Sequence, residues 1–177
     1  PTHLVLDLDP PEGDGFAAAV DAALLVREAL SGAGLEGAVK TSGAKGVHVY
    51  VPVAPGTTYE SGLLFAQIIA TMVAEQHPKH ATIERSVKAR GRRIYVDYMQ
   101  NALGKTLASA YSARASEFAG VSTPVTWDEV DTGVSPRDFT VANFGERIKA
   151  AGDSWAALRK SKGLQLDALK RSHALRR

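Results

Sequence analysis

Two aspartates at the end of a short apolar segment are the first residues whose type and spacing could do chemistry. Asp7 and Asp9 stand two positions apart, and Pro10 follows them. The alternating leucines of residues 3–8 predict a strand, with the leucines facing the core and both carboxylates on the opposite face. Carboxylates this close repel each other, so a hard divalent cation such as Mg²⁺ or Mn²⁺ is the expected compensating charge. Two aspartates at this spacing also occur by chance, so a metal site here requires further ligands from other segments.

Two further segments repeat this arrangement. Residues 47–53 and 94–98 both alternate apolar with polar or aromatic side chains, which predicts strands with one buried face. On the other face they carry His48 and Asp97. Taken singly, His48 fits a hydrogen-bonded structural histidine and Asp97 a surface aspartate. If the three strands are neighbours, however, both residues converge with the aspartate pair.

The elements that must position these residues alternate along the chain. The apolar spacing predicts helices from about residue 16 to 30 and from 57 to 76, and a further strand at 83–87, which gives the order βαβαββ. After residue 98 the chain is expected to be irregular until basic helical segments begin near residue 143. The buried stripe of the second helix is predicted to contain Leu63, Leu64, Ile68 and Met72.

A glycine-containing turn precedes the His48 strand. Residues 41–46 read Thr-Ser-Gly-Ala-Lys-Gly, and glycine lets backbone N–H groups approach an anion while Ser42 and Lys45 add a donor and a charge. The spacing is not that of a P-loop, and the segment also fits an ordinary turn. The bound anion could be a triphosphate, which Arg90 in a basic turn and Arg114 further along the chain could also contact.

Composition excludes several classes of function. The 177 residues contain no cysteine, which rules out thiol catalysis and cysteine zinc sites, and the net charge is only +2 with a pI near 9.0. Apolar runs are far shorter than the roughly 18 residues of a membrane span, which predicts a soluble protein with no membrane partner. The basic tail over 159–177 is expected either to contact DNA or to pack as a helix against the core.

Several segments, taken in order, resemble the polymerase domain of bacterial ATP-dependent DNA ligase D, a member of the archaeo-eukaryotic primase superfamily. The resemblance runs from about residue 3 to residue 155. The segments that carry it are Asp7–Pro10, Thr41–Pro52, Val96–Asn101, Tyr111–Arg114 and Val121–Pro124.

This resemblance implies an α/β (α+β) fold, in which a mixed, largely antiparallel sheet has helices packed on one face of a primase-like catalytic core. It implies a template-directed nucleotidyltransferase that adds ribonucleotides or deoxyribonucleotides to DNA ends in non-homologous end joining, with two Mn²⁺ or Mg²⁺ ions. The implied catalytic metal ligands are Asp7, Asp9 and Asp97. The implied nucleotide-binding residues are Ser42, Lys45, Gly46, His48, Arg90, Gln100 and Arg114.

The implied partners are an NTP or dNTP, a DNA end with template and primer, the end-binding protein Ku, and a linked or separate ligase domain. The implied location is the bacterial cytoplasm, with the nucleoid. Members of this family carry a further segment before the strand that ends in their Asp-x-Asp motif, which is Asp7-Leu8-Asp9 here. We therefore expect residues 1–177 to be a single catalytic core that matches the C-terminal part of such a domain. Ser116 also departs from the family, because many relatives have another arginine there.

Two other functions remain open from the sequence. One is a non-catalytic fragment that binds nucleotides or DNA ends. The other is a phosphohydrolase of the haloacid dehalogenase kind, in which the first aspartate of a strand-borne DxD motif is a nucleophile. That motif usually continues with Gly-Thr, whereas Pro10 and Pro11 follow here.

Overall fold

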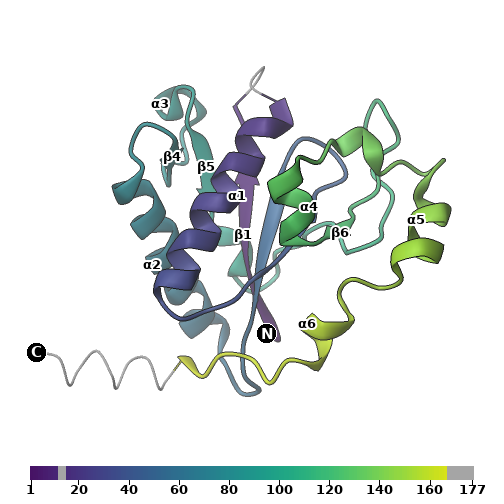
Figure 1. Ribbon diagram of the computed structural model, residues 1–177. Coiled ribbons are helices and arrows are strands. Elements are labelled where there is room, and N and C mark those ends of the chain that lie inside the picture. The colour runs from purple at the N-terminus through teal and green to yellow at the C-terminus, as the bar shows by residue number, and fades with distance from the viewer. Residues whose placement is uncertain (12–14, 167–177) are drawn as a thin grey trace, which may run out of the picture.

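The computed structural model describes residues 1–11 and 15–166, and a six-stranded sheet lies at the centre of this described part (Figure 1). The strand order is β4-β5-β1-β3-β2-β6, and every neighbouring pair is antiparallel except β4 and β5, which are parallel. This confirms the mixed, largely antiparallel sheet. The strands are β1 (His3–Asp9), β2 (Ala38–Thr41), β3 (Val47–Pro52), β4 (Ala81–Thr82), β5 (Ile94–Asp97) and β6 (Pro124–Val125).

Two long helices, α1 (Gly15–Gly32) and α2 (Tyr59–Gln76), cover one face of the sheet (Figure 1). The leucines of β1 are buried beneath them, and the polar face of β1 is turned away, as the strand periodicity predicts. Helix α1 presents small residues at helical spacing, which lets it lie close to the strands. Its buried residues are Ala19, Ala22, Ala23, Val26, Ala29 and Leu30.

The predicted stripe of α2 is wrong in part. Leu64 and Ile68 are about half exposed, and the fully buried face instead consists mainly of small residues. Close packing between α2, α1 and the sheet favours small side chains at the contact, so residue size outweighs hydrophobicity there. The buried residues of α2 are Gly62, Ala66, Ile69, Ala70 and Val73.

The strand predicted at 83–87 is also wrong. Strand β4 ends at Thr82, and the chain then turns into the short helix α3 (Val87–Arg90). Side chains take over the backbone donors in this turn: the Thr82 hydroxyl accepts from Glu84 N, and the Glu84 carboxylate accepts from Ser86 N. Strands β2 and β6, which the sequence did not predict, are short and add to the β3 side of the sheet.

The remaining described residues form short elements joined by loops. Residues 102–123 carry no named helix or strand, as expected, and a helix begins close to the predicted residue 143. The expectation of an irregular chain up to that point is wrong in part, because β6 and two short helices at Trp127–Thr132 and Pro136–Asp138 lie before it. The basic tail extends outside the described residues after 166. No helix in the described part is long and apolar enough to cross a membrane. The short elements are η1 (Met99–Asn101), α4 (Trp127–Thr132), η2 (Pro136–Asp138), α5 (Phe144–Ala151) and α6 (Ala156–Lys160).

Candidate active site

Three aspartates meet on the sheet face that the two long helices leave open. Asp7 and Asp9 end β1, and Asp97 ends β5 directly opposite Asp7 in the antiparallel register. One carboxylate oxygen from each residue can lie within 4.8 Å of one from each of the other two. The structure therefore brings together the three residues that the sequence singled out.

Asp97 is held in a fixed orientation by its neighbours. Its Oδ1 accepts hydrogen bonds from Met99 N at 2.7 Å and from the Tyr95 hydroxyl at 3.3 Å, and its Oδ2 accepts one from Gln100 Nε2 at 3.1 Å. Asp97 is only 8% exposed, so these hydrogen bonds are largely shielded from water. Gln100 thus lies at the aspartate cluster through its contact with Asp97, and its role in nucleotide binding stays a prediction.

The electrostatics of the cluster favour a cation. Desolvation raises the pKa of Asp9 to about 6, and the negative charges of Asp7 and Asp97 add to this rise, whereas the positive charge of Arg90 opposes it. Clustered carboxylate oxygens are the donor set that Mg²⁺ and Mn²⁺ prefer. The residues present therefore fit a divalent ion, which would relieve the repulsion that raises the pKa of Asp9.

His48 on β3 lies on the same face, beside the three aspartates. It stands opposite Asp7 in the register, and its Nε2 lies 3.2 Å from Asp7 Oδ1. Burial lowers the pKa of His48 below its ordinary value even though the hydrogen bond to Asp7 acts in the other direction. The imidazole is therefore neutral near pH 7, with Nε2–H donating to the carboxylate, and it fixes one aspartate without adding a charge.

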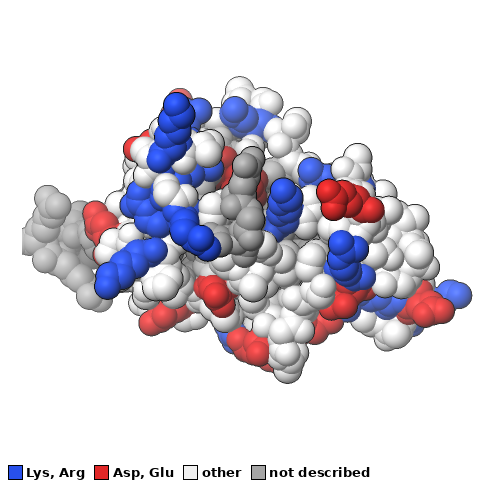
Figure 2. All heavy atoms as spheres, turned by 90° about the horizontal axis from the view of Figure 1, so that it is seen from above, with Lys and Arg blue, Asp and Glu red and all other residues white. Residues whose placement is uncertain are grey.

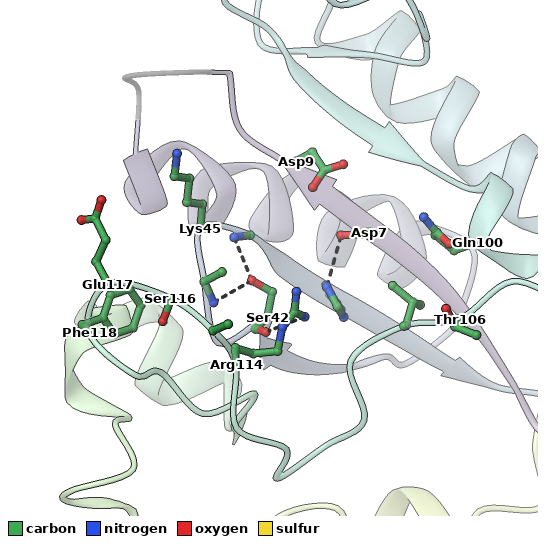
Figure 3. Close-up of a pocket in the computed structure, with 15 residues that line it drawn as sticks. Asp7, Asp9, Ser42, Lys45, Gln100, Thr106, Arg114, Ser116, Glu117 and Phe118 are labelled. Carbon is green, nitrogen blue, oxygen red and sulfur yellow. Dashed lines mark hydrogen bonds and ion pairs between the residues drawn. The ribbon is translucent and has the colours of Figure 1, made fainter.

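The turn before β3 differs from the simple anion loop that the sequence suggested. The Ser42 hydroxyl oxygen accepts from Ala44 N at 3.2 Å and from Gly46 N at 3.0 Å, so these two amides point at the serine (Figure 3). With both lone pairs of the oxygen used, the hydroxyl hydrogen is free to donate towards the cavity. Gly46 also allows the turn to approach β1, because a Cβ there would lie 2.8 Å from the carbonyl oxygen of Leu8.

Arg114 approaches this turn from the loop between η1 and β6. Its Nη1 donates to the Ser42 carbonyl at 3.3 Å, and its side chain runs beside the turn (Figure 3). Gly43 makes this approach possible, because a Cβ there would lie only 2.5 Å from Arg114 Cγ, and its φ of +78° is one that other residues rarely adopt. Arg114 is thereby placed next to Ser42, as the phosphate hypothesis requires.

These residues line a cavity of about 570 Å³, which is within the range of small-molecule sites. Asp7 and Asp9 stand at one part of its wall and Lys45 and Arg114 at another, so negative and positive charges face one space (Figure 3). Sequence reasoning missed the part of the wall contributed by the long loop, because a loop has no periodicity to reveal which side faces inward. The missed residues are Thr106, Leu107, Glu117 and Phe118, whereas Ser116, which the sequence comparison had singled out, also lines the cavity.

Arg90 is the predicted phosphate contact that does not line this cavity. Its guanidinium donates to the carbonyls of Glu84 and Arg85 and lies 3.8 Å from the centre of the Tyr95 ring. It influences the site electrostatically, through Asp9. Figure 2 shows Lys and Arg side chains gathered towards the α3 end of the molecule. Arg90 thus brings positive charge close to the aspartates from outside the cavity.

Lys40 on β2 is a further charged residue that the sequence did not single out. Its side chain is fully buried, and Nζ donates to Ser122 Oγ at 2.5 Å and to the Thr41 carbonyl at 3.3 Å. Burial lowers its pKa to about 7, which the negative charge of Asp7 opposes and the positive charge of Arg114 reinforces. Lys40 is opposite His48 in the register, and it joins the sheet to the segment that leads to β6.

Comparisons with known proteins agree with this geometry. The family described as LigD, primase-polymerase domain, matches residues 1–155. The chain is 39% identical over 153 residues to the bifunctional non-homologous end joining protein LigD of Bacillus subtilis, and this match covers 86% of the chain and 25% of that protein. It is 32% identical over 158 residues to the multifunctional non-homologous end joining protein LigD of Pseudomonas aeruginosa, covering 88% of the chain and 19% of that protein.

A solved structure is also similar. The polymerase domain from Mycobacterium tuberculosis ligase D in complex with DNA superimposes with a TM-score of 0.79 at 31% sequence identity. This match covers 89% of the chain and 54% of that domain. The chain thus spans about half of the solved domain and about a quarter of the length of the Bacillus subtilis relative.

Proposed function

The chain belongs to the LigD primase-polymerase domain family, and from this premise we propose that it is a nucleotidyltransferase that adds nucleotides to DNA ends in non-homologous end joining. The observation that carries the proposal is the meeting of three carboxylates with a cavity that also contains Lys45 and Arg114. Family membership leaves the phosphohydrolase alternative without support.

Asp7, Asp9 and Asp97 are the residues that would hold the metal, and we propose two Mn²⁺ or Mg²⁺ ions. Their oxygens already lie within 4.8 Å of one another, and Asp97 is oriented by three hydrogen bonds. When bound, such ions activate the primer 3′-hydroxyl and neutralise charge on the leaving pyrophosphate. The aspartates contribute by fixing where that charge is neutralised.

Positively charged and hydrogen-bond-donating side chains would bind the nucleotide triphosphate. Lys45 and Arg114 supply positive charge to the cavity, and Ser42 supplies a hydroxyl whose oxygen is already saturated by backbone amides. His48 and Gly46 line the same space, and Gln100 lies beside Asp97 at its edge. Transfer of a nucleotidyl group from the triphosphate to the primer 3′-hydroxyl, with pyrophosphate as the leaving group, depends mainly on positioning and charge neutralisation, which these residues would provide.

The proposed macromolecular partner is a DNA end with template and primer. Its support is the relatives: two act in non-homologous end joining by their names, and the similar solved domain is a complex with DNA. Ku and a linked or separate ligase domain are further proposed partners, on family grounds alone. We also propose that residues 1–177 form one catalytic core and that it works in the bacterial cytoplasm with the nucleoid.

Primer extension tests the proposal. The chain is incubated with a DNA primer annealed to a longer template, an NTP or dNTP, and Mn²⁺ or Mg²⁺, and added nucleotides are resolved by length. We expect extension by the unaltered chain, and its loss in Asp7→Ala and Asp9→Ala. Asp128→Ala is the matched control, because Asp128 is an exposed carboxylate in the first turn of α4.

The outcomes separate the open functions. Extension that persists in Asp7→Ala or Asp9→Ala would contradict the metal assignment. Nucleotide binding measured by calorimetry without any extension would replace the enzyme with a non-catalytic binding module. Loss of extension in Asp128→Ala as well would show that any lost carboxylate disrupts the fold, and would remove the support that the other two variants give.

A further inference from the structure

Tyr111 has a backbone conformation that a bulky residue rarely adopts. Its φ is +68°, in the left-handed region, and among the described non-glycine residues only Ala119 shares a positive φ. Such a conformation persists where the surrounding contacts impose it, and it is found most often at functional sites. Tyr111 does not line the cavity, but it lies three residues before Arg114, which does.

Contacts on both sides of Tyr111 hold it in place. Its backbone N–H donates to the Ser122 carbonyl at 2.7 Å, and its hydroxyl donates to Asp153 Oδ1 at 2.5 Å. Its ring also lies against that of Phe144, with 5.8 Å between centroids. Asp153 is itself fixed by an ion pair with Arg159. Backbone and side chain are therefore attached to two different parts of the molecule.

The segment that supplies Asp153 is tied to the sheet. Trp155 packs edge-on against Tyr50 of β3, with ring centroids 4.7 Å apart, and its backbone N–H donates to Asp153 Oδ1 at 3.0 Å. Further along, Leu164 exchanges backbone hydrogen bonds with Pro52 and Ala54 at 2.8 and 3.0 Å. Residues 153–164 are therefore attached to β3, the strand that carries His48.

The backbone from Tyr111 to Arg114 forms one side of a small antiparallel ladder. Ser112 O accepts from Ser122 N at 2.9 Å, Ala113 pairs with Val121, and Arg114 N donates to Gly120 O at 2.8 Å. In such a ladder the register decides which way each side chain points, and a shift by one residue turns every side chain to the other face. Because Tyr111 begins this ladder, the contacts that fix its conformation also help to fix the register in which Arg114 is presented.

We propose that Tyr111 and Asp153 are a positioning pair whose hydrogen bond sets the direction of the Arg114 guanidinium and thereby the affinity for the nucleotide triphosphate. The inference rests on the proposed function, since Arg114 is taken to bind phosphate. Neither residue contacts the cavity, so the pair acts on substrate binding through Arg114 and not on the chemical step.

The experiment measures kcat and KM for an NTP in primer extension, together with calorimetric NTP affinity, for Tyr111→Phe and Asp153→Asn. Tyr111→Phe removes only the donor, so we expect KM and the dissociation constant to rise about tenfold while kcat changes much less. Tyr59→Phe is the matched control, because Tyr59 is an exposed tyrosine at the start of α2.

A second set of variants distinguishes positioning from general stability. Tyr111→Phe introduced into an Arg114→Ala chain should add no further loss, because the pair acts through Arg114. Tyr111→Gly relieves the backbone conformation but lacks the hydroxyl, so it should fold and still bind NTP weakly.

The outcomes are separable from those of the proposed function. Unchanged KM and affinity in Tyr111→Phe would overturn the inference. So would a fall in kcat as large as the fall in affinity together with a lower thermal midpoint, because that pattern indicates general destabilisation. An undiminished effect of Tyr111→Phe in the Arg114→Ala background would also overturn it. An unaltered chain that binds NTP but does not extend primers would remove the proposed enzyme. In that case, weaker NTP binding by Tyr111→Phe would still uphold the positioning pair.

Discussion

The acidic half of the site, Asp7, Asp9 and Asp97, and its cationic half, Ser42, Lys45 and Arg114, are held by different kinds of contact. The aspartates end two adjacent strands, and the register of the sheet sets their separation. Ser42, Lys45 and Arg114 lie on two loops that meet at Gly43. The backbone positions of the acidic half are thus set by strand pairing, whereas the cationic half depends on a few loop contacts.

Substitutions in the two halves should therefore have different effects on catalysis and on binding. Replacing an aspartate removes a charge but leaves the apolar face of the strand intact, so chemistry should fail while the fold persists. A change in a loop contact moves charges that remain present, so binding should weaken by degrees.

The largest effect is expected from Asp97→Asn. The substitution keeps the size of the side chain but removes one of three clustered charges, so primer extension should fall by about 10²–10³-fold. Because the metal-free cluster is repulsive, the thermal midpoint without metal should stay the same or rise. Extension is measured by primer length and stability by calorimetry. A large fall in the metal-free midpoint would show that Asp97 holds the fold and would break the contrast.

A smaller effect is expected from Gly43→Ala. The added Cβ would lie 2.5 Å from Arg114 Cγ and 2.8 Å from Ser122 N, at a φ that alanine tolerates poorly. We expect KM for NTP to rise by about tenfold or more, and the free energy of unfolding to fall by about 1–3 kcal/mol. Steady-state kinetics and denaturant unfolding measure the two effects. Gly145→Ala is the control, because its added Cβ meets open space.

Metal affinity should depend on pH through Asp9. Its folded-state pKa is raised to about 6, so below that pH a cation must displace a proton, and the affinity for Mn²⁺ should fall by up to about tenfold per pH unit. Without metal, the raised pKa means that the stabilising proton is present at low pH and is lost as pH rises through about 6. Mn²⁺ titrations across this range test the prediction. Affinity that is flat from pH 5 to pH 7 would place Asp9 outside the metal site.

The smallest effect is expected from Ser116→Arg, which adds a cation to the loop side. Ser116 lines the cavity, and its hydroxyl accepts from Gly120 N at 2.9 Å, so the gain in charge is partly offset by a lost hydrogen bond. We expect KM for NTP to fall by about two- to fivefold and kcat to remain similar. The effect should weaken as salt is added. A fall in KM that is insensitive to salt would mean that charge is not the cause.

The acidic half could be predicted from the sequence because the alternation of apolar and polar residues reveals the strands that carry it. Period-two alternation fixes which side of a strand each residue faces, and it placed Asp7, His48 and Asp97 on one face correctly. What alternation cannot show is strand order, which becomes known only from the structure. The strand expected at 83–87 failed because the Thr82 and Glu84 side chains bind the backbone there and end the pairing.

The cationic half was predictable only as a set of residue types. Loop residues such as Phe118 have no periodic signal, and the close approach at Gly43 becomes visible only in three dimensions. Lys40 was overlooked because a lysine in a short strand normally lies at the surface. Its burial depends on Ser122, which is distant in sequence, so no local pattern could have revealed it.

Locating Mn²⁺ in crystals of the chain by anomalous scattering tests the central claim most directly. The account predicts anomalous peaks bound by carboxylate oxygens of Asp7, Asp9 and Asp97, and their loss in crystals of Asp97→Asn. Peaks that lie elsewhere while these three carboxylates bind no ion would contradict it.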